Sequence, residues 1–151
     1  MIVKRAYKYR IYPNREQRNF FARTFGCVRL FYNTSLDDMN KLYKEKKEYK
    51  DITPASYKER FPFFKDVDSL ALSNAQLNRN QAFKAFFRNQ NKFPKYKAKR
   101  NKQSYSTNNQ NGTVYISEDC KYISLPKIKN IRIKMHRKFN GVIKTVTVSK
   151  E

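Results

Sequence analysis

Apolar and basic positions alternate along the first twelve residues. Val3, Tyr7, Tyr9 and Ile11 point to one side of an extended segment, a series that Arg5 interrupts. Lys4, Lys8 and Arg10 point to the other side. Successive side chains of a β-strand face opposite ways, so this period of two predicts a strand over residues 1–12 with a basic outer face. Pro13 ends the predicted strand.

Apolar residues then recur every three or four positions, as they do on one face of an α-helix. Asn14 and Gln17 have the spacing of a capping box, which predicts the helix start. The apolar stripe continues through Gly26 and favours one helix over roughly residues 15–46, with two helices joined by a turn at 24–27 as the alternative. The stripe consists of Phe21, Phe25, Val28, Tyr32, Ser35, Met39 and Leu42.

Two further helices are predicted in the middle of the chain. Thr53 and Pro54 have the order of an N-cap and a first helical residue. A longer helix is predicted from Ser69, as its cap, to about Asn89. Arg79 falls on the apolar side of this helix, so we expect it to pair or to extend its charge toward solvent. That side is formed by Leu72, Ala75, Ala82, Phe83 and Phe86.

The C-terminal third returns to a period of two, and Asn-Gly dipeptides at 111–112 and 140–141 predict hairpin turns. A lone strand is not stable by itself, so the N-terminal strand should pair with strands of this region. The sequence therefore predicts an α+β fold, with an antiparallel OB-like β-barrel of residues 1–12 and 100–151. Residues 13–99 form a helical domain, with a basic linker, inserted into the barrel.

Charge narrows the class of partner. The chain has 34 Lys and Arg against 12 Asp and Glu, a formal net charge of +22, together with 11 Tyr and 12 Phe. Such an excess points to a polyanion, and the aromatic content favours nucleic acid over an anionic membrane because bases stack on aromatic rings. No apolar run reaches the roughly 20 residues that cross a bilayer. We expect a cytoplasmic protein associated with the nucleoid and not with a membrane.

Catalytic chemistry has little support in the sequence. His136 is the single histidine, Cys27 and Cys120 lie far apart, and most of the carboxylates are interspersed with lysines. Two-metal nuclease sites need several converging carboxylates. We therefore expect no catalytic residues, no metal ligands and no cofactor in this chain, and we expect both cysteines to be free thiols.

Candidate nucleic-acid contacts concentrate in a segment that contains no acid. Residues 88–102 carry many cations with aromatic residues between them, which is typical of a phosphate-tracking segment; a solvated linker is the alternative. Arg29 lies at the edge of the apolar stripe. Asn74 and Gln76 carry amides that can pair with adenine, although helix-surface polarity explains them equally well. The predicted contacts outside the second helix start are Lys4, Lys8, Arg10, Arg29, Lys84, Arg88, Lys95, Tyr96, Lys97, Lys99, Arg100, Lys102, Gln103, Ser104 and Tyr105.

Several ordered motifs together resemble the N-terminal half of the TnpB/OrfB family, the transposon-encoded RNA-guided DNA endonucleases related to type V CRISPR effectors. The matching stretches are YKYRIYPNREQ (7–17), TFGCVRLFYN (24–33), AFKAFFR (82–88), KFPKYKAK (92–99) with QSY (103–105), LPKI (125–128) and GVIKTVTVSKE (141–151).

The resemblance implies a wedge domain and an inserted recognition domain. In the family these bind a structured guide RNA and double-stranded DNA that carries a short adjacent motif. The resemblance places Ser69, Ser73, Asn74 and Gln76 near the motif duplex, and the segment from Gln103 onward at a second contact. The family's RuvC nuclease domain, with its Mg²⁺-binding acids and zinc ribbon, has no counterpart in these residues.

We therefore predict a binding module of an RNA-guided endonuclease that has no nuclease site of its own. One alternative is half of a split nuclease completed by a separate RuvC-containing chain. Another is a generic basic RNA-binding protein.

Overall fold

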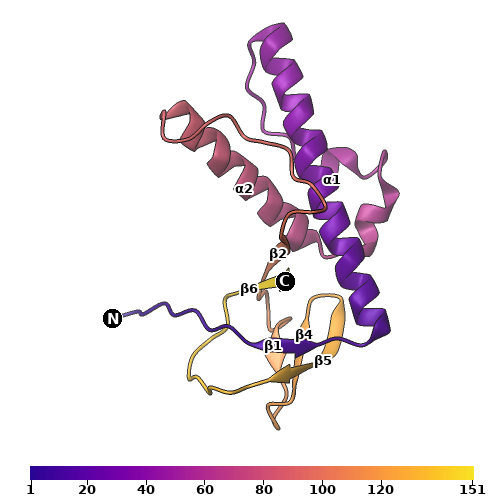
Figure 1. Cartoon of the computed structure of the whole chain (residues 1–151), viewed down its shortest axis with the longest axis vertical. Helices are drawn as coiled ribbons and strands as arrows, with labels where there is room; N and C mark the ends of the chain where they lie inside the picture. Colours follow the sequence, from indigo (N-terminus) through magenta and orange to yellow (C-terminus); the bar gives the residue numbers. More distant parts are fainter.

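The computed structural model describes residues 1–151 and places two helices over two small antiparallel sheets (Figure 1). Helix α1 spans Arg15–Lys46 without interruption, so the single-helix prediction is confirmed and the turn at 24–27 is wrong. Its start is the predicted capping box, in which Asn14 Oδ1 accepts from the Gln17 amide at 2.9 Å and Gln17 Oε1 accepts from the Asn14 amide at 2.9 Å.

Helix α1 is buried more widely than its predicted stripe. The stripe is buried from Phe21 to Met39, and Leu42 is half-buried. A second row, which includes Phe20, Cys27 and Phe31, is also buried. The additional burial arises because α1 packs against α2 on one flank and against β2 and β5 near its start.

Two short 3-10 helices, η1 (Pro54–Tyr57) and η2 (Pro62–Asp66), lead into α2 (Ser69–Phe87). Thr53 precedes Pro54 as predicted, but the element is a single 3-10 turn. The N-cap of α2 is Asp68 and not Ser69. The Asp68 carboxylate accepts from the Leu70 amide at 2.9 Å and from the Thr107 hydroxyl. This buried carboxylate therefore joins the start of α2 to β2.

The strands form a four-stranded sheet in the order β1-β5-β4-β3 and a separate pair of β2 and β6. Their bounds are β1 Arg10–Tyr12, β2 Gln103–Asn108, β3 Tyr115–Ile116, β4 Tyr122–Leu125, β5 Ile128–Lys134 and β6 Thr145–Lys150. The predicted pairing of the N-terminal strand with the C-terminal region is confirmed, because β1 pairs with β5. The α+β class is also confirmed, and closure of the strands into a barrel stays a prediction.

Two sequence expectations about the strands are wrong. The N-terminal strand is shorter than residues 1–12, because β5 ends at Lys134 opposite Arg10 and offers no partner to earlier residues. Neither Asn-Gly dipeptide closes a hairpin. The first lies between β2 and β3 and the second between β5 and β6, which in each case belong to different sheets. Long-range pairing of β2 with β6, rather than local turn chemistry, decides these partners.

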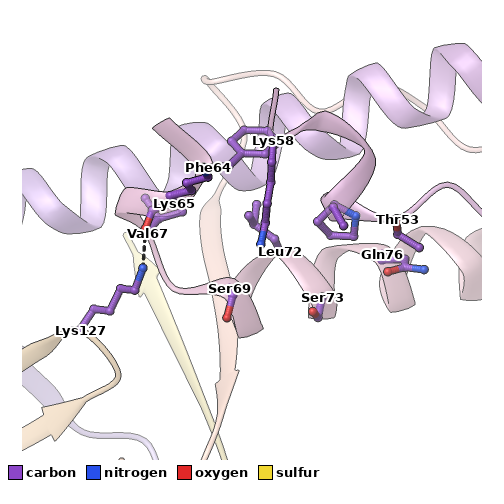
Figure 2. Close-up of a pocket in the computed structure, with 12 residues that line it drawn as sticks. Thr53, Lys58, Phe64, Lys65, Val67, Ser69, Leu72, Ser73, Gln76 and Lys127 are labelled. Atoms are coloured by element: carbon purple, nitrogen blue, oxygen red, sulfur yellow. Dashed lines mark hydrogen bonds between the residues drawn. The ribbon is translucent and has the colours of Figure 1, made fainter. Parts of the chain in front are cut away.

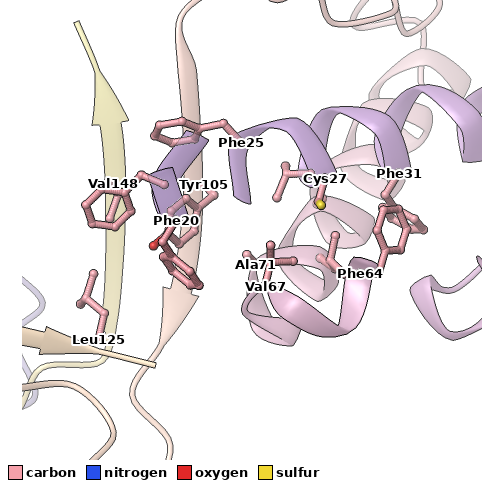
Figure 3. Close-up of a cluster of buried hydrophobic side chains, with 14 of the residues drawn as sticks. Phe20, Phe25, Cys27, Phe31, Phe64, Val67, Ala71, Tyr105, Leu125 and Val148 are labelled. Atoms are coloured by element: carbon pink, nitrogen blue, oxygen red, sulfur yellow. The ribbon is translucent and has the colours of Figure 1, made fainter. Parts of the chain in front are cut away.

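One apolar core links helices and sheets (Figure 3). Phe20 and Phe25 of α1 lie beside Tyr105 of β2 and Val148 of β6, all of them buried. The same cluster continues through η2 into the start of α2. The helices and strands are therefore held in one arrangement, which fixes the surfaces described next. The division into an inserted domain and a barrel stays a prediction.

Candidate nucleic-acid interface

The first half of α2 forms one wall of a pocket of about 490 Å³ (Figure 2). Ser69, Ser73 and Gln76 are spaced by four and three positions, so they lie on one face of the helix and line this pocket. We call it the α2 pocket. Its lining consists of Thr53, Pro54, Ala55, Lys58, Phe64, Lys65, Val67, Ser69, Leu72, Ser73, Gln76 and Lys127. Three of the four residues that the resemblance placed near a motif duplex therefore meet in one cavity.

Three lysines from separate segments line the same pocket. Lys58 follows η1, Lys65 belongs to η2, and Lys127 lies in the turn between β4 and β5. The Lys127 backbone is left-handed, with φ 67°, and its ammonium donates to the Lys65 carbonyl oxygen. No carboxylate is among the lining residues. The pocket is therefore positively charged and offers hydroxyl and amide groups, the combination that meets phosphates and base edges.

Gln76 is held in place within the pocket wall. Its Nε2 donates to Asp51 Oδ1 at 3.1 Å, and Asp51 also accepts from Arg79 and Asn80. Asp51 thereby fixes the loop after α1 against α2. A side-chain amide with one restrained nitrogen loses less conformational freedom when it binds a base.

Asn74 does not enter the pocket. Its Nδ2 donates to the carbonyl oxygens of Leu70 at 3.0 Å and Ser106 at 2.9 Å, and to Asn108 Oδ1 at 2.8 Å. Through these bonds Asn74 connects α2 to β2. Its amide group is used inside the fold, which the sequence pattern did not indicate.

A second hollow, of about 160 Å³, lies where α1, the basic segment and the start of β2 meet. We call it the α1 groove. It brings together five predicted contacts from distant parts of the chain, and Arg29 Nη1 lies 3.4 Å from its acceptor Gln103 Oε1. The groove is lined by Phe25, Val28, Arg29, Lys97, Ala98, Asn101, Lys102, Gln103 and Ser104.

The basic segment between α2 and β2 is docked along α1 and is not a free linker (Figure 1). Asn33 binds the backbone of Lys97 twice, accepting from its amide at 2.7 Å and donating to its carbonyl oxygen at 2.8 Å. The Lys97 ammonium lies 4.4 Å from the centre of the Tyr32 ring. Desolvation of this ammonium lowers the pKa of Lys97, although the residue as a whole is exposed. The Tyr96 hydroxyl donates to Asp37 at 3.0 Å. The contacts of Tyr96 and Lys97 thus hold the segment, and Lys95, Lys99 and Arg100 are exposed.

The remaining predicted contacts are scattered over the surface or buried. Lys4 and Lys8 precede β1, where Lys8 pairs with Glu151 at 2.6 Å, and Arg10 lies on β1. Lys84 and Arg88 are exposed at the end of α2. Tyr105 is only 3% exposed and packs against Phe21 and Phe25, so its ring belongs to the core.

The charge excess remains largely unpaired in the fold. Ion pairs involve only Lys8, Lys41, Arg79 and Lys102 among the 34 basic residues. Histidine, cysteine and acidic side chains form no group of three or more that could hold a metal ion. Neither helix combines the length and hydropathy needed to cross a bilayer.

Comparison with known proteins relates the chain to transposon-encoded proteins. A family model described as a helix-turn-helix domain, named for OrfB of IS605, matches residues 1–48, which here form β1 and α1. A Streptomyces pristinaespiralis protein described as an RNA-guided DNA endonuclease is 37% identical over 65% of this chain and 26% of its own length. Escherichia coli K12 InsQ, described in the same terms, is 26% identical over 95% of this chain and 37% of its own length. The chain thus spans 26% and 37% of the length of these two curated relatives.

Proposed function

The chain belongs to the TnpB/OrfB family of RNA-guided DNA endonucleases, and from this membership we propose that residues 1–151 are its nucleic-acid-binding part. In this proposal they bind a structured guide RNA and read a short motif in duplex DNA. The proposal assigns no step of cleavage to residues 1–151.

The α2 pocket is the observation that carries the proposal. Phosphate contacts position a protein on DNA, whereas contacts to base edges specify the sequence. The pocket offers both kinds of group within one cavity: lysine ammonium groups at Lys58, Lys65 and Lys127, and an amide at Gln76. We propose that Gln76 and Ser73 face base edges while the lysines meet the flanking phosphates.

The α1 groove supports a separate RNA contact. Its cations come from Arg29, Lys97 and Lys102, and the exposed cations of the docked segment continue from it. Guide RNA in such systems is held through its backbone and shape rather than its sequence. A docked basic segment beside a basic groove suits that mode of binding.

The test of the motif-reading role starts from a pool of duplexes with a randomised stretch. The purified chain selects duplexes from this pool, and the affinity for an enriched duplex is compared with that for a scrambled one. Gln76→Ala should reduce this discrimination by about 1–3 kcal/mol, the usual value of an amide contact to a base. Lys127→Ala should weaken both duplexes alike, because phosphates carry no sequence information.

Gln81→Ala is the matched control, since Gln81 is exposed on α2 and lies outside the pocket. Melting temperatures confirm that the variants fold. The motif-reading role would be overturned if no motif were enriched. It would also be overturned if Gln76→Ala lowered the affinity for the enriched and the scrambled duplex equally.

A further inference from the structure

The outer face of the four-stranded sheet carries exposed rings and cations that the two hollows do not use. Ile11 of β1 pairs with Ile133 of β5, and Ile131 of β5 pairs with Ile123 of β4. The last three are buried and Ile11 packs against the same core, so these isoleucines define the inner face of the sheet. The residues between them must point to the opposite face, because side chains alternate along a strand.

Those alternate residues form an ordered array across three strands. Arg132 of β5 lies directly opposite Tyr12 of β1 on one side and Tyr122 of β4 on the other. Arg10 lies directly opposite Lys134. Neighbouring strands are about 4.8 Å apart, so the two tyrosines flank Arg132 at a separation of about 10 Å. The array contains three cations and no acid.

Both rings in this array are available to a ligand. Tyr12 is 48% exposed and Tyr122 is 40% exposed. Other tyrosines use their hydroxyls within the chain, Tyr57 and Tyr96 by donating to carboxylates, whereas those of Tyr12 and Tyr122 are not engaged in this way.

None of the three cations of the array forms an ion pair in the fold, and the Glu151 carboxylate, which pairs with Lys8, acts on Arg10 only at longer range. Arg10 and Lys134 lie directly opposite one another, and like charges in this arrangement disfavour strand pairing. A phosphate between them would remove that repulsion. The face is therefore complementary to a ligand that has both flat rings and negative charges.

We propose that this face binds an unpaired nucleic-acid strand, with bases stacked on Tyr12 and Tyr122 and phosphates at Arg10, Arg132 and Lys134. Bases within a duplex are already stacked on each other, whereas unpaired bases are free to stack on aromatic side chains. The inference rests on the proposed nucleic-acid function, but none of these five residues lines the α2 pocket or the α1 groove.

Tryptophan fluorescence tests the stacking directly, because the chain contains no tryptophan. Tyr12→Trp and Tyr122→Trp each introduce a single reporter, and Tyr43→Trp places a control on α1, where Tyr43 is 47% exposed. Each variant is titrated with single-stranded RNA and single-stranded DNA of about ten nucleotides and with duplex DNA of about ten base pairs. Single strands should quench the two sheet reporters and leave the α1 reporter unchanged, and comparison of the RNA and DNA arms identifies the preferred strand.

Affinity measurements supply the second test. Tyr12→Ala and Tyr122→Ala should each weaken single-strand binding about 5- to 100-fold, whereas Tyr12→Phe and Tyr122→Phe should retain it, because phenylalanine keeps the stacking ring. Binding of the selected motif duplex should not change.

Absence of quenching, or quenching equal to that of the α1 reporter, would overturn the inference. A blue shift of the sheet reporters' emission that grows with protein concentration, in the absence of nucleic acid, would show that the face binds a second copy of the chain. That result would also overturn the inference. If the sheet reporters are not quenched but motif discrimination is intact, this inference fails and the proposed function stands. If the sheet reporters are quenched but no motif is discriminated, only the motif-reading role fails.

Discussion

At the residue scale, burial separates side chains with the same chemistry into different roles. Arg79 is 0% exposed and donates to Asp51 at 2.5 Å and to the Ile52 carbonyl oxygen at 2.8 Å, with its guanidinium 5.6 Å from the centre of the Phe31 ring. Burial lowers the pKa of Arg79, and the Asp51 charge opposes that shift. Arg79 was expected to pair or reach solvent, and it pairs. This cation is therefore structural, unlike the exposed lysines.

Removal of the Asp51 charge should destabilise the fold. Asp51→Asn leaves the Arg79 guanidinium buried without its counter-charge, so the free energy of unfolding should fall by about 2–3 kcal/mol. This loss is smaller than for a fully buried ion pair, because Asp51 is itself half exposed. Arg79→Met, which leaves no buried charge, should cost less. Denaturant unfolding measures both, with the exposed Asp66→Asn as the control. An Asp51→Asn variant as stable as the control would contradict this account of the pair.

At the element scale, single side chains connect each helix to the sheets. Gln17 closes the capping box of α1, and its Nε2 also donates to the carbonyl oxygens of Lys129 at 3.0 Å and Asn130 at 3.1 Å in β5. Asp68 and Asn74 make the corresponding connection from α2 to β2. The helix starts are thus fixed to the strands beneath them.

The two roles of Gln17 can be separated by substitution. Gln17→Glu keeps the oxygen that accepts from the Asn14 amide but loses both donated bonds to β5, so it should destabilise by about 1–2 kcal/mol. Asn14→Ala removes the cap alone and should cost about 1 kcal/mol. Thermal unfolding of the two variants gives the comparison. If Gln17→Glu were neutral, the link to β5 would contribute nothing to stability.

The docking of the basic segment on α1 should weaken in acid. Hydrogen bonds from Lys41 and Tyr96 lower the pKa of Asp37 below its ordinary value of 3.8. A carboxyl group whose pKa is lower in the folded state stabilises above its unfolded pKa and loses that contribution as pH falls through the folded value. Below about pH 4 the Tyr96 contact should therefore loosen.

Amide hydrogen exchange over residues 95–99 measures this loosening between pH 5 and pH 2.5. Asp37→Asn is the matched variant, because its amide oxygen still accepts from Tyr96 but does not titrate. The difference in exchange between the two proteins should appear only at the acid end. The same pH response in both would show that Asp37 does not control the segment.

At the scale of the whole molecule, the net charge of +22 is distributed over surfaces that the fold positions. The α2 pocket, the α1 groove and the outer sheet face each combine cations with groups that can contact bases. The shared apolar core holds helices and strands in one arrangement. A long nucleic-acid ligand could therefore contact more than one of these surfaces at once.

The salt dependence of binding reports how many phosphates the docked segment meets. Lys95, Lys99 and Arg100 are exposed, so replacing all three with alanine should leave the melting temperature unchanged. Each phosphate contact contributes about −0.9 to the slope of log K against log salt on duplex DNA, so the slope should flatten by roughly two to three. The loss should be alike for all sequences. An unchanged slope would reduce the segment to a connection between α2 and β2.

The sequence by itself determined the local elements of this protein. Periodicity predicts the extent of α1 and the return to strands, because a helix or strand repeats its environment every few residues. The spacing of Asn14 and Gln17 predicts the capping box. The first strand needs a partner because a lone strand is not stable. The cationic surface also follows from composition. The ordered motifs indicated the TnpB/OrfB family, which the comparisons show.

Only the tertiary structure decided which of these residues meet. Lys58, Lys65 and Lys127 were not predicted as contacts, because no local pattern shows that η1, η2 and the turn between β4 and β5 meet beside α2. Asn74 and Tyr105 matched a binding pattern but are used inside the fold. Hydrophobic periodicity shows that a side chain faces an interior, but not which segment covers it. That choice depends on long-range pairing, such as that of β2 with β6, which no local pattern encodes.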